Sequence, residues 1–208
     1  LRGVPSGRLS VAASPTFAHL LMTPVREFGE LHPQVSIHLS FEERVVDLVK
    51  ESFDVAIRIG HPQDSSLVAA PIVRGDSVLC ATPSYLEAHG TPQHPDDLRR
   101  HECIVMRSPN WTFSKSSERY EIPVSGRMMT NTGATARLAS LEGLGITMAP
   151  TWFVRDELRS GALVQVLADY QIEPRETNVN AVYPARAYLP PKVRLFIEHL
   201  REHFADLT

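Results

Sequence analysis

The sequence contains few lysines, few cysteines and no long apolar run. Only Lys50, Lys115 and Lys192 are lysines among the 21 basic residues, which are scattered along the chain. The formal net charge is −3. A chain with neither a basic patch nor a positive balance has no electrostatic means of holding a polyanion. We therefore exclude these 208 residues as a nucleic-acid-binding domain.

The two cysteines, Cys80 and Cys103, lie within apolar runs and have no adjacent basic residue. This predicts buried thiols in a reducing compartment rather than a disulfide or a redox-sensing pair. No apolar run is long enough to cross a bilayer, and residues 1–5 do not form a signal peptide. Because the sequence does not begin with methionine, we expect residues 1–6 to be a linker remnant with more chain upstream.

Motifs of catalysis are also missing. The sequence has no G-x-S-x-G elbow, no glycine-rich phosphate loop and no cysteine with an obvious histidine partner. The segment 199–203 matches the zinc-binding pattern H-x-x-E-H, but only five residues follow it, so a downstream third ligand has no place. We therefore predict no catalytic residue, no metal and no cofactor, although a site assembled from distant segments stays open.

The first part of the chain, residues 7–60, alternates between strand and helix patterns, which is typical of a mostly parallel sheet with crossover helices. Strands are predicted at residues 9–13, 35–41 and 54–59, and a short helix at 45–49. A longer helix opens at Ser14 and Pro15, and Pro24 should kink or loosen it. Its apolar stripe consists of Phe17, Leu20, Leu21, Val25, Phe28 and Leu31.

A second set of elements follows the apolar segment 69–81. The predicted elements are a helix from Pro83 that ends at Gly90, a short helix at 95–100, a strand leading to Met106, a strand at 124–129, a helix at 134–142 and a strand at 146–149. Residues 178–183 then return to the first lobe, and an amphipathic helix spans 190–204. The first lobe is thus interrupted by the second, which predicts a two-strand hinge.

Two stretches resemble a known family. The segments 82–106, TPSYLEAHGTPQHPDDLRRHECIVM, and 143–150, GLGITMAP, are similar in order and spacing to the effector-binding domain of LysR-type transcriptional regulators. The resemblance extends from Gly7 to about Phe204. It implies an α/β, two-lobed periplasmic-binding-protein-like fold of type 2, with two Rossmann-like subdomains joined by the hinge. Subdomain I would comprise residues 7–81 and 177–208, and subdomain II residues 82–176.

The same resemblance implies a function. The chain would be a ligand-sensing regulatory domain that binds a small-molecule effector, most often an organic acid, in the cleft between the lobes. It would work in the cytoplasm as a homodimer, or as a tetramer at full length, and reach promoter DNA through an N-terminal winged helix-turn-helix that this sequence lacks. Two alternatives share the architecture, namely an exported solute-binding protein of a transporter and an enzyme.

Effector contacts are expected where helices start after strands, because free backbone N–H groups there attract anions. Three segments meet this condition, around Ser14, Thr132 and Thr151. With the resemblance, they predict contacts at Ser14, Pro15, Thr16, Phe17, Asn131, Thr132, Gly133 and Thr151. Ordinary helix capping explains these residues as well, and Phe17 fits core packing equally.

Arg58 and Gly60 close the third predicted strand. The resemblance implies that this strand end faces the cleft, where one interpretation has the arginine hold a carboxylate in a bidentate pair and the glycine let a ligand approach the backbone. The alternative is an arginine that points to solvent or pairs with Asp54 or Asp64.

The homodimer contact is implied by the resemblance, which assigns it to the first long helix and to the strand 35–41. That strand alternates apolar with polar residues, as a sheet edge does. The implied contact residues are Leu21, Val25, Phe28, Ile37 and Leu39.

Overall fold

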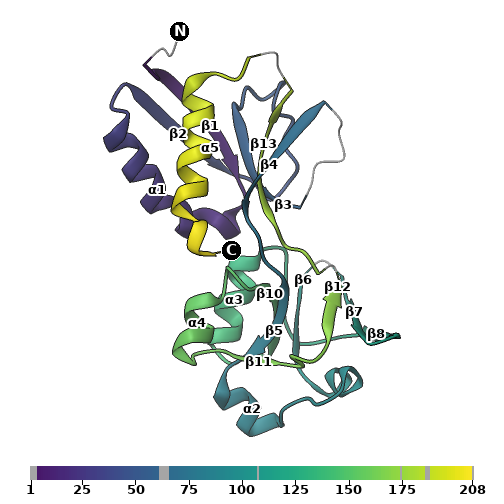
Figure 1. Ribbon diagram of the computed structural model, residues 1–208. Helices are drawn as coiled ribbons and strands as arrows, with labels where there is room; N and C mark the ends of the chain where they lie inside the picture. The colour runs from purple at the N-terminus through teal and green to yellow at the C-terminus, as the bar shows by residue number, and fades with distance from the viewer. Residues whose placement is uncertain (1–3, 61–65, 107, 174, 186–187, 208) are drawn as a thin grey trace. The chain divides into compact units, whose positions relative to one another are not determined.

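The computed structural model describes residues 4–60, 66–106, 108–173, 175–185 and 188–207. Its chain folds into two compact units (Figure 1). Unit 1 is made of Leu1–Arg74 and Asn178–Thr208, and unit 2 of Gly75–Thr177. The sequence boundary proposed after Ala81 lies one strand later than this division, because Ser77–Ala81 pairs with strands of unit 2.

Unit 1 is built on a five-stranded sheet with the order β2-β1-β3-β13-β4. Its strands are β1 (Gly7–Ala13), β2 (Val35–Phe41), β3 (Val55–Ile59), β4 (Leu67–Val73) and β13 (Val179–Pro184). The first three strands run parallel, whereas β13 is antiparallel to both β3 and β4. The mostly parallel sheet and the place of β2 at its edge agree with the sequence pattern.

Helices α1 (Ala18–Leu31) and α5 (Pro191–His203) pack against each other and lie over the sheet (Figure 1). A single 3-10 turn, η1 (Pro15–Phe17), precedes α1, and another, η3 (Ala205–Leu207), follows α5. The predicted stripes are largely buried, with Leu21, Phe28 and Phe196 at 0 % exposure. Helix α1 continues through Pro24, whose side chain is buried.

The predicted helix at residues 45–49 is not formed. Residues 42–54 form irregular backbone with bends and a turn at 48–52 instead, and Val46 and Leu48 pack with Ala12, Ala56 and Val182. The reason is local, because the Asp47 carboxylate accepts from the backbone N–H groups of the second and third residues after it. Aspartate commonly diverts a backbone from helix in this way. The segment still covers one face of the sheet.

Unit 2 contains a second five-stranded sheet with the order β11-β5-β10-β6-β9. Its strands are β5 (Ser77–Ala81), β6 (Cys103–Met106), β9 (Met129–Thr130), β10 (Ile146–Pro150) and β11 (Val164–Val166). Strands β6, β9 and β10 are parallel. The helical elements of the unit are α2 (Pro83–His89), η2 (Pro95–Arg100), α3 (Gly133–Leu141) and α4 (Arg155–Ser160).

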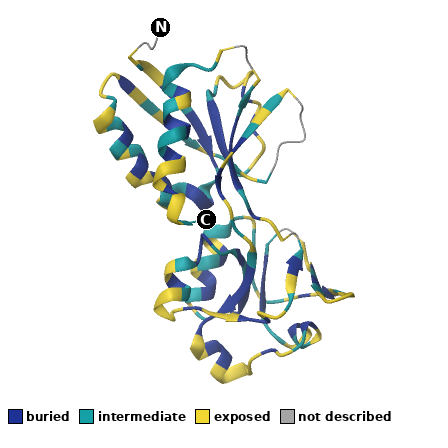
Figure 2. Ribbon diagram, viewed as in Figure 1, coloured by how far each residue is buried: buried dark blue, intermediate teal, exposed yellow. Residues whose placement is uncertain are grey.

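A separate three-stranded sheet, β12-β7-β8, completes unit 2 and was not predicted. It consists of β7 (Asn110–Lys115), β8 (Glu118–Pro123) and β12 (Gln171–Glu173), and its apolar face joins the core of the unit (Figure 2). The predicted strand at 124–129 is replaced by an irregular segment before β9. Gly126 lies so close to Cys103 that a Cβ would be 2.2 Å from the Cys103 carbonyl oxygen, which fixes this path. Among the described residues, no helix combines the length and apolarity needed to span a bilayer.

Candidate functional site

The carboxyl ends of β1 and β3 place two predicted contacts side by side in unit 1. Ala12 pairs with Ala56, and the Ser14 N–H donates to the Ile57 carbonyl at 3.3 Å, so Ser14 lies next to Arg58. On the other side of β3, Arg58 is directly opposite Asn180 of β13. Side chains opposite each other on paired strands share one face of the sheet. Ser14, Arg58 and Asn180 therefore form a polar row at this edge.

Arg58 has no anionic partner within the described part of the chain. The first candidate partner, Asp54, instead accepts from Lys192 Nζ at 2.9 Å and from the Ser10 N–H at 2.9 Å. The second, Asp64, lies outside the described residues. The Arg58 side chain is half-buried, and this burial lowers the pKa of its guanidinium. A half-buried cation with no counter-ion is well suited to an incoming anion.

Asn180 was missed by the sequence analysis, although a lone asparagine within the apolar stretch Val179–Pro184 was a visible signal. It is 1 % exposed, and its Nδ2 donates to the Gly60 carbonyl at 2.9 Å. Its Oδ1 has no hydrogen-bond partner among the described residues. Gly60 has φ of +83°, and a Cβ there would meet nothing within 4 Å. Asn180 thus holds the turn after β3 while its own oxygen stays unsatisfied, which is costly in a folded chain.

In the segment after β1, Ser14 caps the turn that follows, whereas Thr16 and Phe17 are buried. Ser14 Oγ accepts from the Thr16 N–H at 3.3 Å, and Pro15 follows as the first residue of η1. Thr16 is 5 % exposed and Phe17 is 1 % exposed, with the Phe17 ring edge-on to that of Phe204 at 5.5 Å. The predicted effector contact at Phe17 is corrected by this packing, because its ring is buried in the core of unit 1.

In unit 2 the predicted contacts lie at the carboxyl ends of β9 and β10. Thr132 caps α3, since its Oγ1 accepts from the Thr135 N–H at 3.0 Å and donates to the Thr135 Oγ1 at 2.8 Å. Asn131 is exposed, and Gly133 is the first residue of the helix. Thr151 is half-buried, and its N–H donates to the Asp76 carbonyl at 2.9 Å. Capping accounts for the Thr132 hydroxyl, whereas Asn131 has its side chain in solvent.

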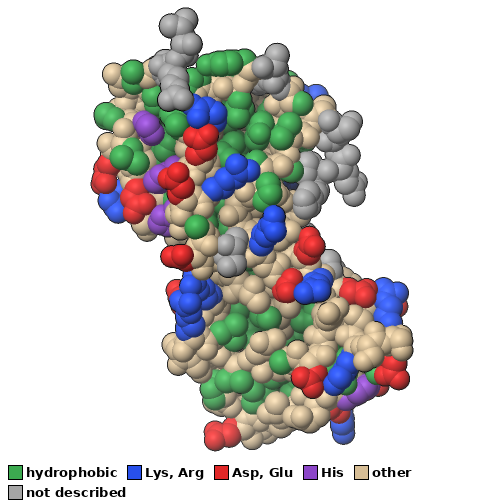
Figure 3. Space-filling view, viewed as in Figure 1, with side chains coloured by type: hydrophobic (Ala, Val, Ile, Leu, Met, Phe, Trp, Pro, Cys, Tyr) green, Lys and Arg blue, Asp and Glu red, His purple; other side chains and the backbone are tan. Residues whose placement is uncertain are grey.

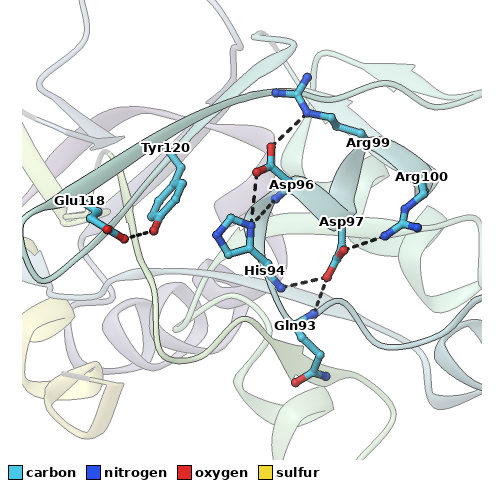
Figure 4. A network of polar contacts seen from close by, with 8 residues as sticks. All are labelled: Gln93, His94, Asp96, Asp97, Arg99, Arg100, Glu118 and Tyr120. Atoms are coloured by element: carbon cyan, nitrogen blue, oxygen red, sulfur yellow. Dashed lines mark hydrogen bonds and ion pairs between the residues drawn. The ribbon is translucent and has the colours of Figure 1, made fainter.

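A hollow of about 340 Å³ opens at the opposite edge of this sheet, before β6 and β9. It is lined by Arg99, Arg100, His101, Glu102, Ser125, Gly126 and Arg127. Each arginine already has a carboxylate partner, at 3.2, 2.9 and 3.3 Å respectively. Figure 4 shows two of these pairs within the cap of η2, where Asp97 also accepts from the His94 N–H. The three arginines of this hollow are therefore paired, whereas Arg58 has no carboxylate partner among the described residues.

The histidine pair of the H-x-x-E-H pattern is held by structural contacts at α1 and α5, where histidine and carboxylate side chains gather in Figure 3. His199 Nε2 lies 3.0 Å from the Pro24 carbonyl oxygen, and His203 Nδ1 lies 3.1 Å from Glu27 Oε2. Across the described ranges, no group of three histidine, cysteine or carboxylate side chains could hold a metal ion. Cys80 and Cys103 are unpaired and buried.

Two of the five implied dimer contacts need correction. Leu21 and Phe28 are 0 % exposed, because they fill the core between α1, α5 and the sheet. Buried side chains of a single chain present no surface to a partner. Val25, Ile37 and Leu39 are half-buried, and for them the dimer contact stays a prediction.

Residues 2–205 match the family described as the LysR substrate binding domain. The chain is a LysR substrate-binding domain. Its curated relatives include the HTH-type transcriptional regulator DmlR of Escherichia coli K12, with 33 % identity over 212 residues, 99 % of this chain and 68 % of the relative. Another is the regulator PtxR of Pseudomonas aeruginosa, with 34 % identity over 98 % of this chain and 66 % of the relative.

Solved structures of LysR-type regulators share the fold of this domain. CrgA of Neisseria meningitidis has a TM-score of 0.86 and 28 % identity, covering 96 % of this chain and 69 % of CrgA. The full-length virulence activator AphB of Vibrio cholerae has a TM-score of 0.82 and 31 % identity, covering 95 % of this chain and 68 % of AphB. The LysR substrate-binding domain thus has the predicted two-lobed periplasmic-binding-protein-like fold, and it spans about two thirds of the length of these relatives.

Proposed function

We propose that this LysR substrate-binding domain senses a small carboxylate, with Arg58 as the residue that holds the carboxylate group. The observation that carries the proposal is the half-buried guanidinium of Arg58, which lacks a counter-ion among the described residues. A carboxylate matches the planar fork of a guanidinium, so two parallel hydrogen bonds form. The pair would also remove the cost of keeping an unpaired cation out of water.

The neighbouring residues support the same ligand chemistry. Ser14 stands beside Arg58, and Gly60 leaves the backbone open with no atom near its missing side chain. We extend the proposal to the strand-end residues of unit 2, Asn131, Thr132, Gly133 and Thr151, as effector contacts. The N-terminus of α3 favours a negative charge by about 0.3–1 kcal/mol.

The test is a thermal-shift comparison of benzoate with benzamide and of succinate with succinamide. A ligand bound only to the native state at a hundredfold excess over its dissociation constant adds about 2.7 kcal/mol, which corresponds to a rise of about 5–11 °C for a domain of this size. We expect a carboxylate, and not its amide, to stabilise the wild type. Arg58→Met should abolish the shift, whereas Arg119→Met, at an exposed arginine paired with Glu173, should keep it.

An equal shift with the amide, or a full shift in Arg58→Met, would overturn the role of Arg58. Arg58 is a cleaner target than Thr132, because Thr132→Ala also removes the cap of α3 and lowers stability by about 1 kcal/mol without any ligand. A change in melting temperature of the unliganded Thr132→Ala protein would therefore say nothing about binding.

The remaining parts of the proposal concern the whole protein. Its relatives are transcriptional regulators, and we propose that this domain regulates rather than catalyses, in the cytoplasm, with no cofactor. Promoter DNA would be bound by a separate N-terminal domain. Effector-dependent regulation requires that the effector bind two states of the protein with different affinities. To move the population from 1:99 to 99:1, the effector must bind the favoured state more tightly by about 5.5 kcal/mol.

We also propose a homodimer that uses the edge strand β2. Ile37 is half-buried on this strand, and Ser36 beside it is exposed. Ile37→Asp should yield monomers by light scattering with an unchanged circular dichroism spectrum, because a charge would be desolvated in the contact. Ser36→Asp serves as the control on the opposite face of the strand and should leave the mass unchanged. A dimer that survives Ile37→Asp would exclude this surface.

A further inference from the structure

The chain passes between the units twice, after Arg74 and after Thr177. We call the residues beside these two crossings, Gly75–Ser77 and Arg175–Thr177, the crossover segments. Both belong to unit 2, and they are hydrogen bonded to each other. The Thr177 N–H donates to the Gly75 carbonyl at 2.7 Å, and the Thr177 Oγ1 donates to the same oxygen at 3.0 Å. Two residues further on, the Ser77 N–H donates to the Arg175 carbonyl at 3.0 Å. The segments thus form one paired connection instead of two independent linkers.

Trp152 contacts both crossover segments. Its indole Nε1 donates to the Thr177 carbonyl at 2.9 Å, and the whole side chain is 3 % exposed. Against the other segment, a Cβ on Gly75 would lie 2.6 Å from the indole Cδ1 and 3.0 Å from the Thr151 Oγ1. No side chain fits at residue 75 unless the indole moves. The indole is therefore in close contact with both of the paired crossover segments.

The residues around Trp152 connect it to the predicted effector contacts of unit 2. Thr151 is its direct neighbour and is bonded to Asp76 in the first crossover segment. On the other side, the Phe153 ring lies 5.8 Å from the Trp152 ring and 5.6 Å from the guanidinium of Arg137. Arg137 belongs to α3, the helix that Thr132 caps, and its side chain is paired with Glu157 of α4. Thr151 is thus adjacent to Trp152, whereas α3 is linked to Trp152 only through Arg137 and Phe153.

We propose that Trp152 is a positioning residue that holds the paired crossover in one conformation and transmits ligand contact at Thr151 to it. Closely packed interiors transmit small displacements because they cannot absorb them. A ligand that shifts Thr151 moves the adjacent indole against Gly75, so the hydrogen bond from Trp152 to Thr177 must shift as well. The role of Thr151 rests on the proposed function, whereas the restraint of the crossover by Trp152 does not.

The test is therefore made without ligand. Spin labels are attached to cysteines introduced at Glu87 of α2 and Glu202 of α5, which are both exposed. The native cysteines are 0 % and 1 % exposed and stay unlabelled. Double electron–electron resonance then gives the distribution of distances between the units, with labelled chains diluted into unlabelled ones. Trp152→Phe keeps a ring but removes the N–H donor, and we expect the distribution to become at least twice as wide.

Trp111→Phe is the matched control, because Trp111 is also a buried tryptophan of unit 2 but packs in a core cluster that does not include Trp152. Its distribution should equal that of the wild type. An unchanged width in Trp152→Phe, or an equal widening in Trp111→Phe, overturns the proposal. If Trp152→Phe does not fold, Gly75→Ala provides the same perturbation from the opposite side of the contact, with Gly29→Ala, where a Cβ meets no atom within 4 Å, as its control. A wild-type width in Gly75→Ala is equally decisive against it.

Discussion

Phe28→Ala tests most directly whether Phe28 lies on the face of α1 that packs in the core or on the face that could contact a second copy. The Phe28 side chain is 0 % exposed. Three rings surround it, with centroid distances of 5.2 Å to Phe196, 4.6 Å to His32 and 5.7 Å to His199. Replacement of a buried phenylalanine by alanine costs about 3–5 kcal/mol, and more when the cavity cannot collapse.

The surroundings of Phe28 leave little room for collapse. His199 is fixed by its contact with the Pro24 carbonyl, and Phe196 lies on the neighbouring helix α5. We therefore expect a loss of about 4–5 kcal/mol, at the upper end of the range. At about 2–4 °C per kcal/mol, the melting temperature should fall by about 8–20 °C.

Urea denaturation followed by circular dichroism measures this loss. The slope of the unfolding free energy against urea concentration should stay the same as in the wild type. Leu31→Ala, at a position of the same helix that is 65 % exposed, is the control and should change stability by less than about 0.5 kcal/mol. Light scattering on folded Phe28→Ala should give the wild-type mass. A loss below about 1.5 kcal/mol, or monomers of undiminished stability, would refute the placement of Phe28 in the core and return it to the dimer surface.

Two further predictions concern buried polar chemistry. Burial raises the pKa of Cys80 and of Cys103 to about 12, against an ordinary value of 9.0. The pKa of each thiol is higher in the folded than in the unfolded chain, so the neutral thiol favours the folded state. This contribution to the free energy of unfolding is complete below pH 9 and is lost between pH 9 and 12, by up to about 1.4 kcal/mol per pH unit for each thiol. The predicted loss is checked by measuring denaturation midpoints across this pH range, with Cys80→Ala and Cys103→Ala as controls. Midpoints that do not change with pH would contradict the prediction. For Lys192 and Asp54, whose side chains are 19 % and 21 % exposed, a double-mutant cycle with Lys192→Met and Asp54→Asn should give a coupling of about 1–3 kcal/mol. The exposed pair Arg26 and Glu30 should give less than about 0.5 kcal/mol, and equal couplings would contradict the difference in burial.

Regular periodicity made much of the fold predictable from the sequence. The stripe of α5 and the alternation of β2 are local patterns that repeat over several residues, and each was read with the correct element type. The residues 45–49 have an equally apolar pattern, but the Asp47 carboxylate captures backbone N–H groups and turns the chain. One side chain was sufficient to override the pattern.

The candidate site was only partly predictable, for a different reason. Ser14 and Arg58 could be proposed because each follows or ends a predicted strand. Asn180 could not be placed beside Arg58, because 122 positions of sequence separate the two and only the register of β13 on β3 joins them. Long-range register of this kind leaves no local signal. The same holds for the approach of Gly75 to Trp152, since nothing near either residue in the sequence indicates the other.

The insertion of unit 2 within unit 1 has a consequence for how the chain is made. Strand β3 is complete at Ile59, but its neighbour β13 begins only at Val179, after the whole of unit 2. On the ribosome, unit 2 is therefore complete as a continuous segment while the sheet of unit 1 still has an unpaired edge. Such an edge invites pairing with other chains. A nascent chain halted near residue 177 would contain a whole unit 2 and an unfinished unit 1, and residues 178–208 would decide whether unit 1 folds or the chain aggregates.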